Sequence, residues 1–413
     1  MKCVCQIHYP KTVITAYGCM RLADKMPKAD WQNVVDDFLK IQDIQFIPVE
    51  VPYKVPVYPA WWSGQGMTTW RATIIKVTAD DGLVGYGAQH SIKSEVKEVG
   101  ESRTIRELLA GSDAFNIERV SRILSGISVY YSPLRFWATE IALWDLIGKA
   151  THTPLYKLLG GYQDKVLAYA STGTSKSPKE YAEDATKYLE QGFKAIKIRI
   201  RSEKITDDIA SVRAVRDAIG SDAKILADAN QGGPFSGPIW SYERALKTAK
   251  ELEKLDVYWL EEPLHHDALN DLAKLSAAAD ILIAGGEDET GLHRFQQLLE
   301  GNCFDVIQPD SQQTGIWESR KIAAIAEARF KLFAPHTWGT GINLAAGLHL
   351  AAAVPNCPIL EYCIDLPAFD QGRDPLLKEP LTVENDGYLR LPEKPGLGIE
   401  IDEQALERFK TKG

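Results

Sequence analysis

The stretch Tyr258-Trp259-Leu260-Glu261-Glu262-Pro263 runs three bulky residues into two adjacent carboxylates and ends in a proline. A bulky run of this kind is typical of a buried parallel strand. The proline ends the strand because it has no N–H group to donate to a neighbour. Neighbouring residues of a strand point to opposite faces, so only one of Glu261 and Glu262 can face a given pocket. A lone acidic pair is more often the start of a solvated loop, but this pair is not alone.

The same pattern occurs on both sides of this stretch. Residues 224–230 (KILADAN) and 281–287 (ILIAGGE) are also short apolar runs that lead to a carboxylate, and helix-like segments separate the three runs. Strand and helix patterns alternate in this way from residue 166 onward. The predicted strands cover residues 166–171, 193–200, 224–228, 258–261, 281–287, 304–309, 331–334 and 358–360, and the predicted helices cover 178–191, 207–219, 242–255, 268–279, 291–300, 316–328 and 342–353. Eight strands with crossover helices predict a parallel α/β barrel rather than an open sheet.

The first 160 residues have a different pattern, which predicts an α+β domain. The predicted elements are strands over residues 44–49, 71–78 and 83–88, a hairpin turn at 80–82, and helices over 30–41 and within 92–160. The long segment 52–69 contains the adjacent aromatics Trp61 and Trp62. Such a segment is typical of a functional lid, but the two rings could equally pack on the body of the protein.

Four parts are therefore expected. They are an N-terminal extension (1–43), an α+β capping domain (44–160), a catalytic barrel (161–375) and a C-terminal segment that returns to the capping domain (376–413). The fold class is an α/β modified TIM barrel of the (β/α)7β type with an N-terminal cap.

Composition narrows the choice of partners. The 413 residues are 45% apolar and 25% charged, with a net charge of −9, which argues against nucleic acid or an anionic membrane as a partner. No apolar run has membrane-spanning length, and the N-terminus lacks a signal-peptide core, so a cytoplasmic location is expected. The spacing of Cys3, Cys5 and His8 fits no standard zinc pattern, so reduced cysteines without a metal are favoured.

Three carboxylates end three consecutive predicted strands: Asp228, Glu261 and Glu287. Neighbouring strands lie about 4.8 Å apart, so these side chains can converge. They would repel one another, and some would stay protonated, unless a cation joined them. Oxygen ligands with room for water favour Mg²⁺, with Mn²⁺ possible.

The later strands end in Asp310, His336 and Glu361. A carboxylate beside an imidazole fixes the tautomer and raises its basicity, which predicts that His336 is a general base or acid. Glu361 could donate a hydrogen bond if apolar surroundings keep it protonated.

The ordered set of motifs resembles the enolase superfamily and, within it, the mandelate racemase/muconate lactonizing enzyme branch. The resemblance covers roughly residues 44–400 and rests on Lys197-Ile198-Arg199, Asp228-Ala229-Asn230, Trp259-Leu260-Glu261-Glu262-Pro263, Gly286-Glu287, Pro309-Asp310, His336, Glu361 and residues 142–161.

The resemblance implies a role for each site residue. Asp228, Glu261 and Glu287 would bind Mg²⁺, His336 oriented by Asp310 would move the α-proton of a carboxylic acid, and Glu361 would hydrogen-bond the ene-diolate oxygen. Lys197 would lie beside the substrate carboxylate. The substrate-binding residues would be Trp61 and Trp62 in the lid, Gln89-His90 at a second capping contact, and Asn230. The resemblance also implies a homo-oligomer, a dimer or an octamer.

One position departs from the family pattern. Many members have Lys-x-Lys on the second strand, where the second lysine is a base, but this chain has Arg199. Arginine is a poor base because it stays protonated. We therefore expect a one-base dehydration of a sugar acid to a 2-keto-3-deoxy acid by a lyase.

Several alternatives remain open. One is a cycloisomerase acting on a lactone or anhydro-sugar acid, in which Arg199 would bind a substrate carboxylate or hydroxyl group. The others are a racemase or epimerase with an unusual base and a catalytically silent barrel. The adjacent His265 and His266 could enter the mouth of the barrel or be a solvated pair.

Overall fold

The computed structural model describes residues 39–62, 64, 66–90, 101–130, 136–233, 237–364 and 374–411. Most of the helix expected over residues 30–41 lies outside these ranges, and its last residue, Ile41, instead begins a strand. Cys3, Cys5 and His8 also lie outside the described residues. Within these ranges no helix is both long and apolar enough to cross a membrane.

The N-terminal part forms an antiparallel sheet. Its strands are β1 (Ile41–Val57), β2 (Met67–Ala79) and β3 (Val84–His90), in the order β1-β2-β3. The predicted loop over residues 52–69 is wrong at both ends, because β1 continues to Val57 and β2 starts at Met67. β1 tolerates its prolines because it is an edge strand, where a missing N–H group leaves no ladder bond unmade.

Helices pack against this sheet. α2 (Glu101–Leu109) packs on β1, and α4 (Ala138–Ala150) packs on β2 and β3, while α3 (Ile117–Tyr130) and α5 (Leu155–Leu158) pack on α4. α4 is one of the helices expected within residues 92–160, and it is buried on all sides from Ala138 to Gly148. It lies so close to β3 that a Cβ atom at Gly87 would be 1.9 Å from the Ala138 carbonyl oxygen. Only glycine allows the two backbones to approach this closely.

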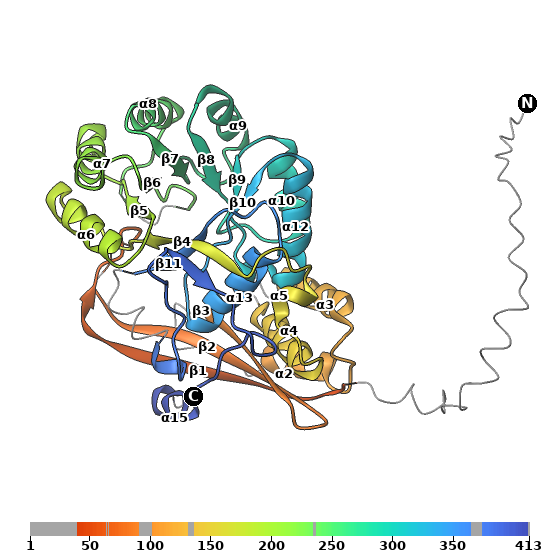
Figure 1. Ribbon diagram of the computed structural model, residues 1–413. Coiled ribbons are helices and arrows are strands. Elements are labelled where there is room, and N and C mark those ends of the chain that lie inside the picture. Colours follow the sequence, from red (N-terminus) through yellow and green to blue (C-terminus); the bar gives the residue numbers. More distant parts are fainter. Residues whose placement is uncertain are drawn as a thin grey trace, which may run out of the picture. The chain divides into compact units, whose positions relative to one another are not determined.

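The second part is a curled parallel sheet with helices around its outside (Figure 1). The strands are β4 (Lys165–Ser171), β5 (Ala195–Arg199), β6 (Lys224–Asp228), β7 (Val257–Glu261), β8 (Leu282–Gly285), β9 (Val306–Ile307), β10 (Leu332–Phe333) and β11 (Leu360–Cys363). The helices between them are α6 (Pro178–Glu190), α7 (Ile205–Ile219), α8 (Tyr242–Glu253), α9 (Leu269–Ala278), α10 (Leu292–Glu300), α11 (Ser311–Thr314), α12 (Ile316–Ala328) and α13 (Gly341–Ala352). The short α11 was not predicted.

The strand order β10-β9-β8-β7-β6-β5-β4-β11 follows the chain, except that the last strand lies beside the first. Thr337, just after β10, donates from its backbone N and its Oγ1 to Glu361 in β11 over 3.1 and 2.8 Å. These bonds connect the two ends of the sheet. The predicted fold class, a (β/α)7β barrel with an N-terminal α+β cap, is confirmed.

One side chain from or beside each strand fills the centre of the barrel. The set is Tyr169, Ala195, Leu226, Trp259, Ala284, Val306, Ala334 and Ile359, all buried. Residues two positions further along a strand point to the same side. The side chains two positions after Leu226, Trp259 and Ile359 therefore also point into the barrel. These are Asp228, Glu261 and Glu361, so a polar layer lies directly above the apolar layer, which is called the barrel floor below.

The C-terminal segment contains η1 (Asp374–Leu376), β12 (Tyr388–Arg390) and α15 (Glu403–Phe409). β12 pairs antiparallel with β4. The backbone N of Thr411 donates to the Pro48 carbonyl oxygen over 3.0 Å, so the end of the chain contacts β1.

Candidate active site

Asp228, Glu261 and Glu287 converge above the barrel floor. One carboxylate oxygen from each lies within 4.8 Å of the others. Asp228 and Glu261 are direct partners across β6 and β7, and Gly286, with φ +111°, turns the chain after β8 so that Glu287 follows. The spacing suits one cation bound by three oxygens.

Among the described residues, Glu287 has no hydrogen bond to its Oε2 atom, and its nearest positive charge is His336 Nε2 at 3.8 Å. The Oε2 atom is buried. Burial, together with the nearby carboxylates of Asp228 and Glu261, raises the pKa of Glu287 to about 8, although His336 opposes the shift. A buried oxygen without a partner, beside two like charges, is the environment that a divalent cation would stabilise.

Lys197 compensates the other carboxylates. Its Nζ atom lies 2.5 Å from Glu261, 2.9 Å from Glu361 and 3.5 Å from Asp228, and its side chain is fully buried. Burial would lower the pKa of this ammonium group, but the surrounding carboxylates hold it well above the usual range. Lys197 is therefore a fixed positive charge.

Arg199 is held on every side. Its guanidinium donates to Asp228, to the Thr172 carbonyl oxygen over 2.6 Å and to Asn230 Oδ1 over 3.2 Å. Its Cζ atom also lies 5.3 Å from the Trp61 ring centre and 5.2 Å from that of Trp338. An arginine bound in this way has neither a free face nor a proton that it can release.

Glu361 differs from the prediction. It lies inside β11 rather than at its end. Although burial alone would raise it, the positive charges of Lys197 and His336 hold the pKa of Glu361 below its usual range. The carboxylate accepts bonds from Ser171 Oγ (2.8 Å) and Trp338 Nε1 (2.9 Å). The condition set for a protonated Glu361, apolar surroundings, is not met, because Lys197 and His336 place positive charge beside it.

His336 and Asp310 form a hydrogen-bonded pair, with 2.7 Å between His336 Nδ1 and Asp310 Oδ2. The second ring nitrogen, Nε2, lies 3.8 Å from both Glu287 and Glu361. Burial would lower the pKa of His336, but Glu287, Glu361 and Asp310 raise it to about 10. Nε2 is thus the atom that faces the carboxylate cluster.

The loop between β1 and β2 contacts the barrel. The backbone N of Ala60 donates to the Gly173 carbonyl oxygen over 2.8 Å, and Arg201 donates to the Ala60 carbonyl oxygen over 2.6 Å. Trp61 packs edge-on against Trp338, with ring centres 4.8 Å apart. Trp62 instead lies against its own loop, because a Cβ atom at Gly64 would be 2.3 Å from its ring nitrogen. Trp61 therefore lies at the site.

The other two predicted substrate contacts border the site. Asn230, with φ +42°, donates from its backbone N to Asp228 Oδ1 over 2.8 Å. His90 ends β3, and the charges of Asp310 and His336 act on its imidazole. Its backbone N donates to Gln312 Oε1 over 2.8 Å.

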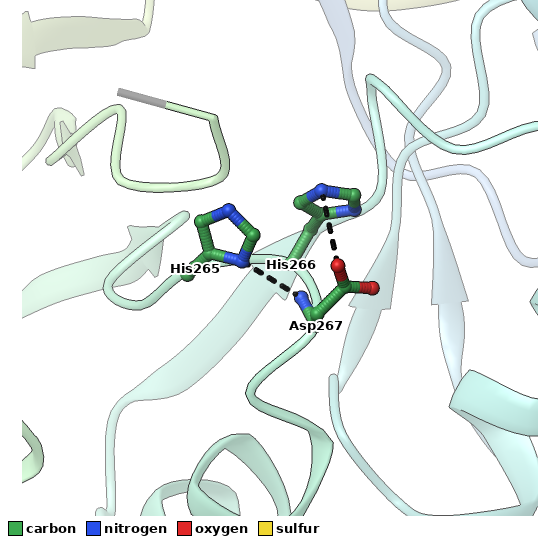
Figure 2. Close-up of side chains that lie close together, drawn as sticks. All are labelled: His265, His266 and Asp267. Atoms are coloured by element: carbon green, nitrogen blue, oxygen red, sulfur yellow. Dashed lines mark hydrogen bonds and ion pairs between the residues drawn. The ribbon is translucent and has the colours of Figure 1, made fainter. Parts of the chain in front are cut away.

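His265, His266 and Asp267 form a second group whose ligand atoms lie within 4.8 Å (Figure 2). These atoms already have protein partners. His265 Nδ1 accepts from the Asp267 backbone N over 3.2 Å, and His266 Nδ1 lies 3.3 Å from Glu289. Asp267 also pairs with Arg294 over 3.1 Å. The group is a hydrogen-bonded turn after β7, and the buried carboxylates fit a hard cation better.

Two family models match this chain. The mandelate racemase/muconate lactonizing enzyme N-terminal domain matches residues 44–160, and the enolase C-terminal domain-like model matches residues 180–405. The chain belongs to the mandelate racemase branch of the enolase superfamily. The resemblance predicted from its motifs is therefore confirmed.

Relatives within this superfamily catalyse more than one kind of reaction. Arabinonate dehydratase of Saccharolobus solfataricus is 32% identical, over 82% of this chain and 90% of the relative. D-galactarolactone cycloisomerase of Agrobacterium fabrum is 31% identical, also over 82% of this chain and 90% of the relative. The structure of D-glucarate dehydratase from Agrobacterium tumefaciens complexed with magnesium has a TM-score of 0.78 at 25% identity, over 91% of this chain and 100% of that chain. Other relatives include an L-Ala-D/L-Glu epimerase of Bacillus subtilis.

Three residues that border the site were not predicted from the sequence. Gln312 contacts Asp310, Trp338 contacts Arg199 and Glu361, and Ser171 contacts Glu361. Gln312 and Trp338 each lie two positions after a predicted catalytic residue, and Ser171 ends β4. That proximity was the available signal.

Proposed function

We propose that this enzyme is a magnesium-dependent lyase. It would remove the α-proton of a sugar acid and eliminate the β-hydroxyl group, giving a 2-keto-3-deoxy acid and water. The observation that carries the proposal is the environment of Arg199. Asp228, Asn230 and two tryptophan rings hold this protonated group where many relatives have a basic lysine, so one base, His336, would act alone.

In the proposed reaction, His336 Nε2 takes the α-proton while Asp310 keeps Nδ1 protonated. The same Nε2–H then protonates the departing β-hydroxyl, so that the C–H and C–O bonds break and water leaves. The resulting enol becomes the 2-keto acid when its hydroxyl group loses a proton and the β-carbon gains one. Returning one proton in this way requires no second base.

Asp228, Glu261 and Glu287 would hold Mg²⁺, or Mn²⁺ in its place. The bound cation supplies positive charge that stabilises the carboxylate as the α-proton leaves. Lys197 would neutralise another part of the negative charge that develops on the substrate carboxylate. In the protein without metal, Glu287 raises the pKa of His336 more than any other charged group does. Pairing Glu287 with a cation would therefore lower the pKa of His336 and yield the neutral imidazole that a base requires.

A cycloisomerase is the second candidate, because D-galactarolactone cycloisomerase is almost as similar as the dehydratase. Ring opening can also use a single base. Epimerisation fits less well, since it needs a base on each face of the α-carbon and Arg199 stays protonated.

We also propose the four-part division of the chain given above and a homo-oligomeric assembly, a dimer or an octamer. Light scattering on the protein as it elutes from a size-exclusion column would measure the mass of the assembly.

The proposed reaction can be tested with a library of mono- and diacid sugars in Mg²⁺. Semicarbazide would detect 2-keto acids, with a His336→Asn variant and an exposed-histidine control, His293→Asn, alongside. We expect product with the wild type and the control but not with His336→Asn. Deuterium exchange without 2-keto acid would favour an isomerase. If no acid gives either 2-keto acid or deuterium exchange, the proposal is contradicted.

A further inference from the structure

The side-chain amide of Gln312 connects the capping domain to the Asp310–His336 pair. Gln312 is buried, with 4% of its surface exposed. Its Oε1 atom accepts from the backbone N of His90 over 2.8 Å. Its Nε2 atom donates to Asp310 Oδ2 over 3.1 Å and to the Trp338 carbonyl oxygen over 2.6 Å. Both amide hydrogens and the amide oxygen therefore have partners.

Gln312 also fixes both oxygens of Asp310. Its backbone N donates to Oδ1 over 2.7 Å, in the cap of α11. Its side chain shares Oδ2 with His336 Nδ1. A carboxylate held at both oxygens cannot rotate, so the imidazole that it binds keeps one orientation. This leaves Nε2 on the side of the carboxylate cluster.

We propose that Gln312 is a positioning residue for His336. It would hold Asp310 in the orientation that aims His336 Nε2 at the substrate, and its bond to His90 would make that orientation depend on the docking of β3. The inference rests on the proposed function only in taking His336 as the base.

Asn343 provides a matched control. Its Nδ2 atom donates to the Ala88 carbonyl oxygen over 2.6 Å, so it also docks β3 onto the barrel. Its other side-chain bonds within the described residues are to Thr340, whose backbone N and Oγ1 donate to Asn343 Oδ1 in the cap of α13. A loss of docking alone would affect Asn343 and Gln312 variants alike, whereas a loss of positioning would affect only Gln312 variants.

The kinetic test compares Gln312→Leu, Gln312→Glu and Asn343→Ser on a substrate identified by the screen. Gln312→Glu keeps an acceptor for His90 but cannot donate to Asp310. For both Gln312 variants we expect kcat to fall about 10- to 100-fold, the usual effect of losing an outer-shell partner, with KM nearly unchanged. For Asn343→Ser we expect a lower melting temperature and a nearly unchanged kcat.

A second measurement needs no substrate. The protein has eight histidines, and it can be labelled with ¹⁵N-histidine for solid-state NMR. The Nδ1–H signal of His336 would be identified by its loss in His336→Asn. The short hydrogen bond to Asp310 shifts the resonance of this proton downfield. We expect the resonance to shift upfield in Gln312→Leu but not in Asn343→Ser. An unchanged signal in Gln312→Leu, or equal changes in both variants, would overturn the inference. A failed substrate screen would leave this result standing, so the two proposals fail separately.

Discussion

The guanidinium carbon of Arg199 lies 5.3 Å from the ring centre of Trp61, so an aromatic residue from the β1–β2 loop covers a cation at the end of β5. The same guanidinium donates to Asp228. One cation thus contacts both the capping loop and a proposed metal ligand. Its position also explains why it would not act as the second base.

Arg199→Lys should lower both activity and stability, although it restores the lysine found in many relatives. A lysine loses the planar set of donors and the flat face that stacks on indole. We expect kcat/KM to fall about 10- to 100-fold and the free energy of unfolding to fall by about 1–3 kcal/mol, as for lost charged hydrogen bonds. Steady-state kinetics and urea unfolding would measure these effects.

Arg244 offers the matched control, because it stacks on Trp240 at 4.7 Å and pairs with Asp208 at 3.5 Å outside the carboxylate cluster. Arg244→Lys should lose stability but keep its activity. Full activity in Arg199→Lys would show that the capping contact and the Asp228 bond are dispensable.

Magnesium should bind more tightly as the pH rises toward about 8. Folding raises the pKa of Glu287 from 4.5 to about 8, so the metal-free protein loses stability as the pH rises through this window. Cation binding must displace the proton from Glu287. The proton displaced from Glu287 should by itself lower the apparent Kd for Mg²⁺ about tenfold per pH unit below 8, and the proton that His336 would lose should extend the pH dependence above 8.

Calorimetry in buffers of different ionisation enthalpy would count the released protons. Glu287→Gln should abolish Mg²⁺ binding and make the metal-free protein more stable than the wild type at pH 9, because it removes a buried negative charge. Glu318→Gln, which changes another carboxyl group whose pKa burial raises, should leave Mg²⁺ binding unaltered. A Kd independent of pH would contradict the proposed role of Glu287.

The periodicity of the sequence was sufficient to predict the barrel and the acids at its strand ends. Each predicted barrel helix agrees with the structure to within two residues at either end, because helix and strand periods are local properties of the chain. The same periodicity predicts that Asp228, Glu261 and Glu287 lie together.

Properties that depend on distant side chains could not be predicted in this way. The ionisation of Glu361 depends on Lys197 and His336, which lie on other strands. The contact between Arg199 and Trp61 joins the two parts of the fold. The length of β1 was missed because its prolines suggest a loop unless the strand is known to lie at an edge.

Asp310→Asn should lower kcat about 10²- to 10⁴-fold with little change in stability. The amide cannot stabilise the imidazolium that forms on His336 and can favour the wrong tautomer. Asp305, just before β9, is the control. It accepts from the backbone N of Ile283 over 3.1 Å and from Lys331 over 2.8 Å. Asp305→Asn should reduce the melting temperature while kcat is retained, and equal losses of kcat in the two variants would argue against the dyad.

Lys197→Met should make the fold depend on magnesium. Lys197 is the cation shared by three buried carboxylates, Asp228, Glu261 and Glu361. Removing one partner of a buried ion pair typically costs about 3–5 kcal/mol, because the opposite charge is left uncompensated. We therefore expect a large drop in melting temperature without metal.

Added Mg²⁺ should then raise the melting temperature of Lys197→Met more than that of the wild type, since the cation binds a more negative cluster. At 100 times its Kd, a ligand contributes about 2.7 kcal/mol, which would offset most of the loss. Lys149→Met removes a partly buried lysine paired with Asp145 over 2.7 Å, and its melting temperature should respond to Mg²⁺ as the wild type does. Equal Mg²⁺ shifts in all three proteins would mean that Lys197 and the cation do not share the same carboxylates.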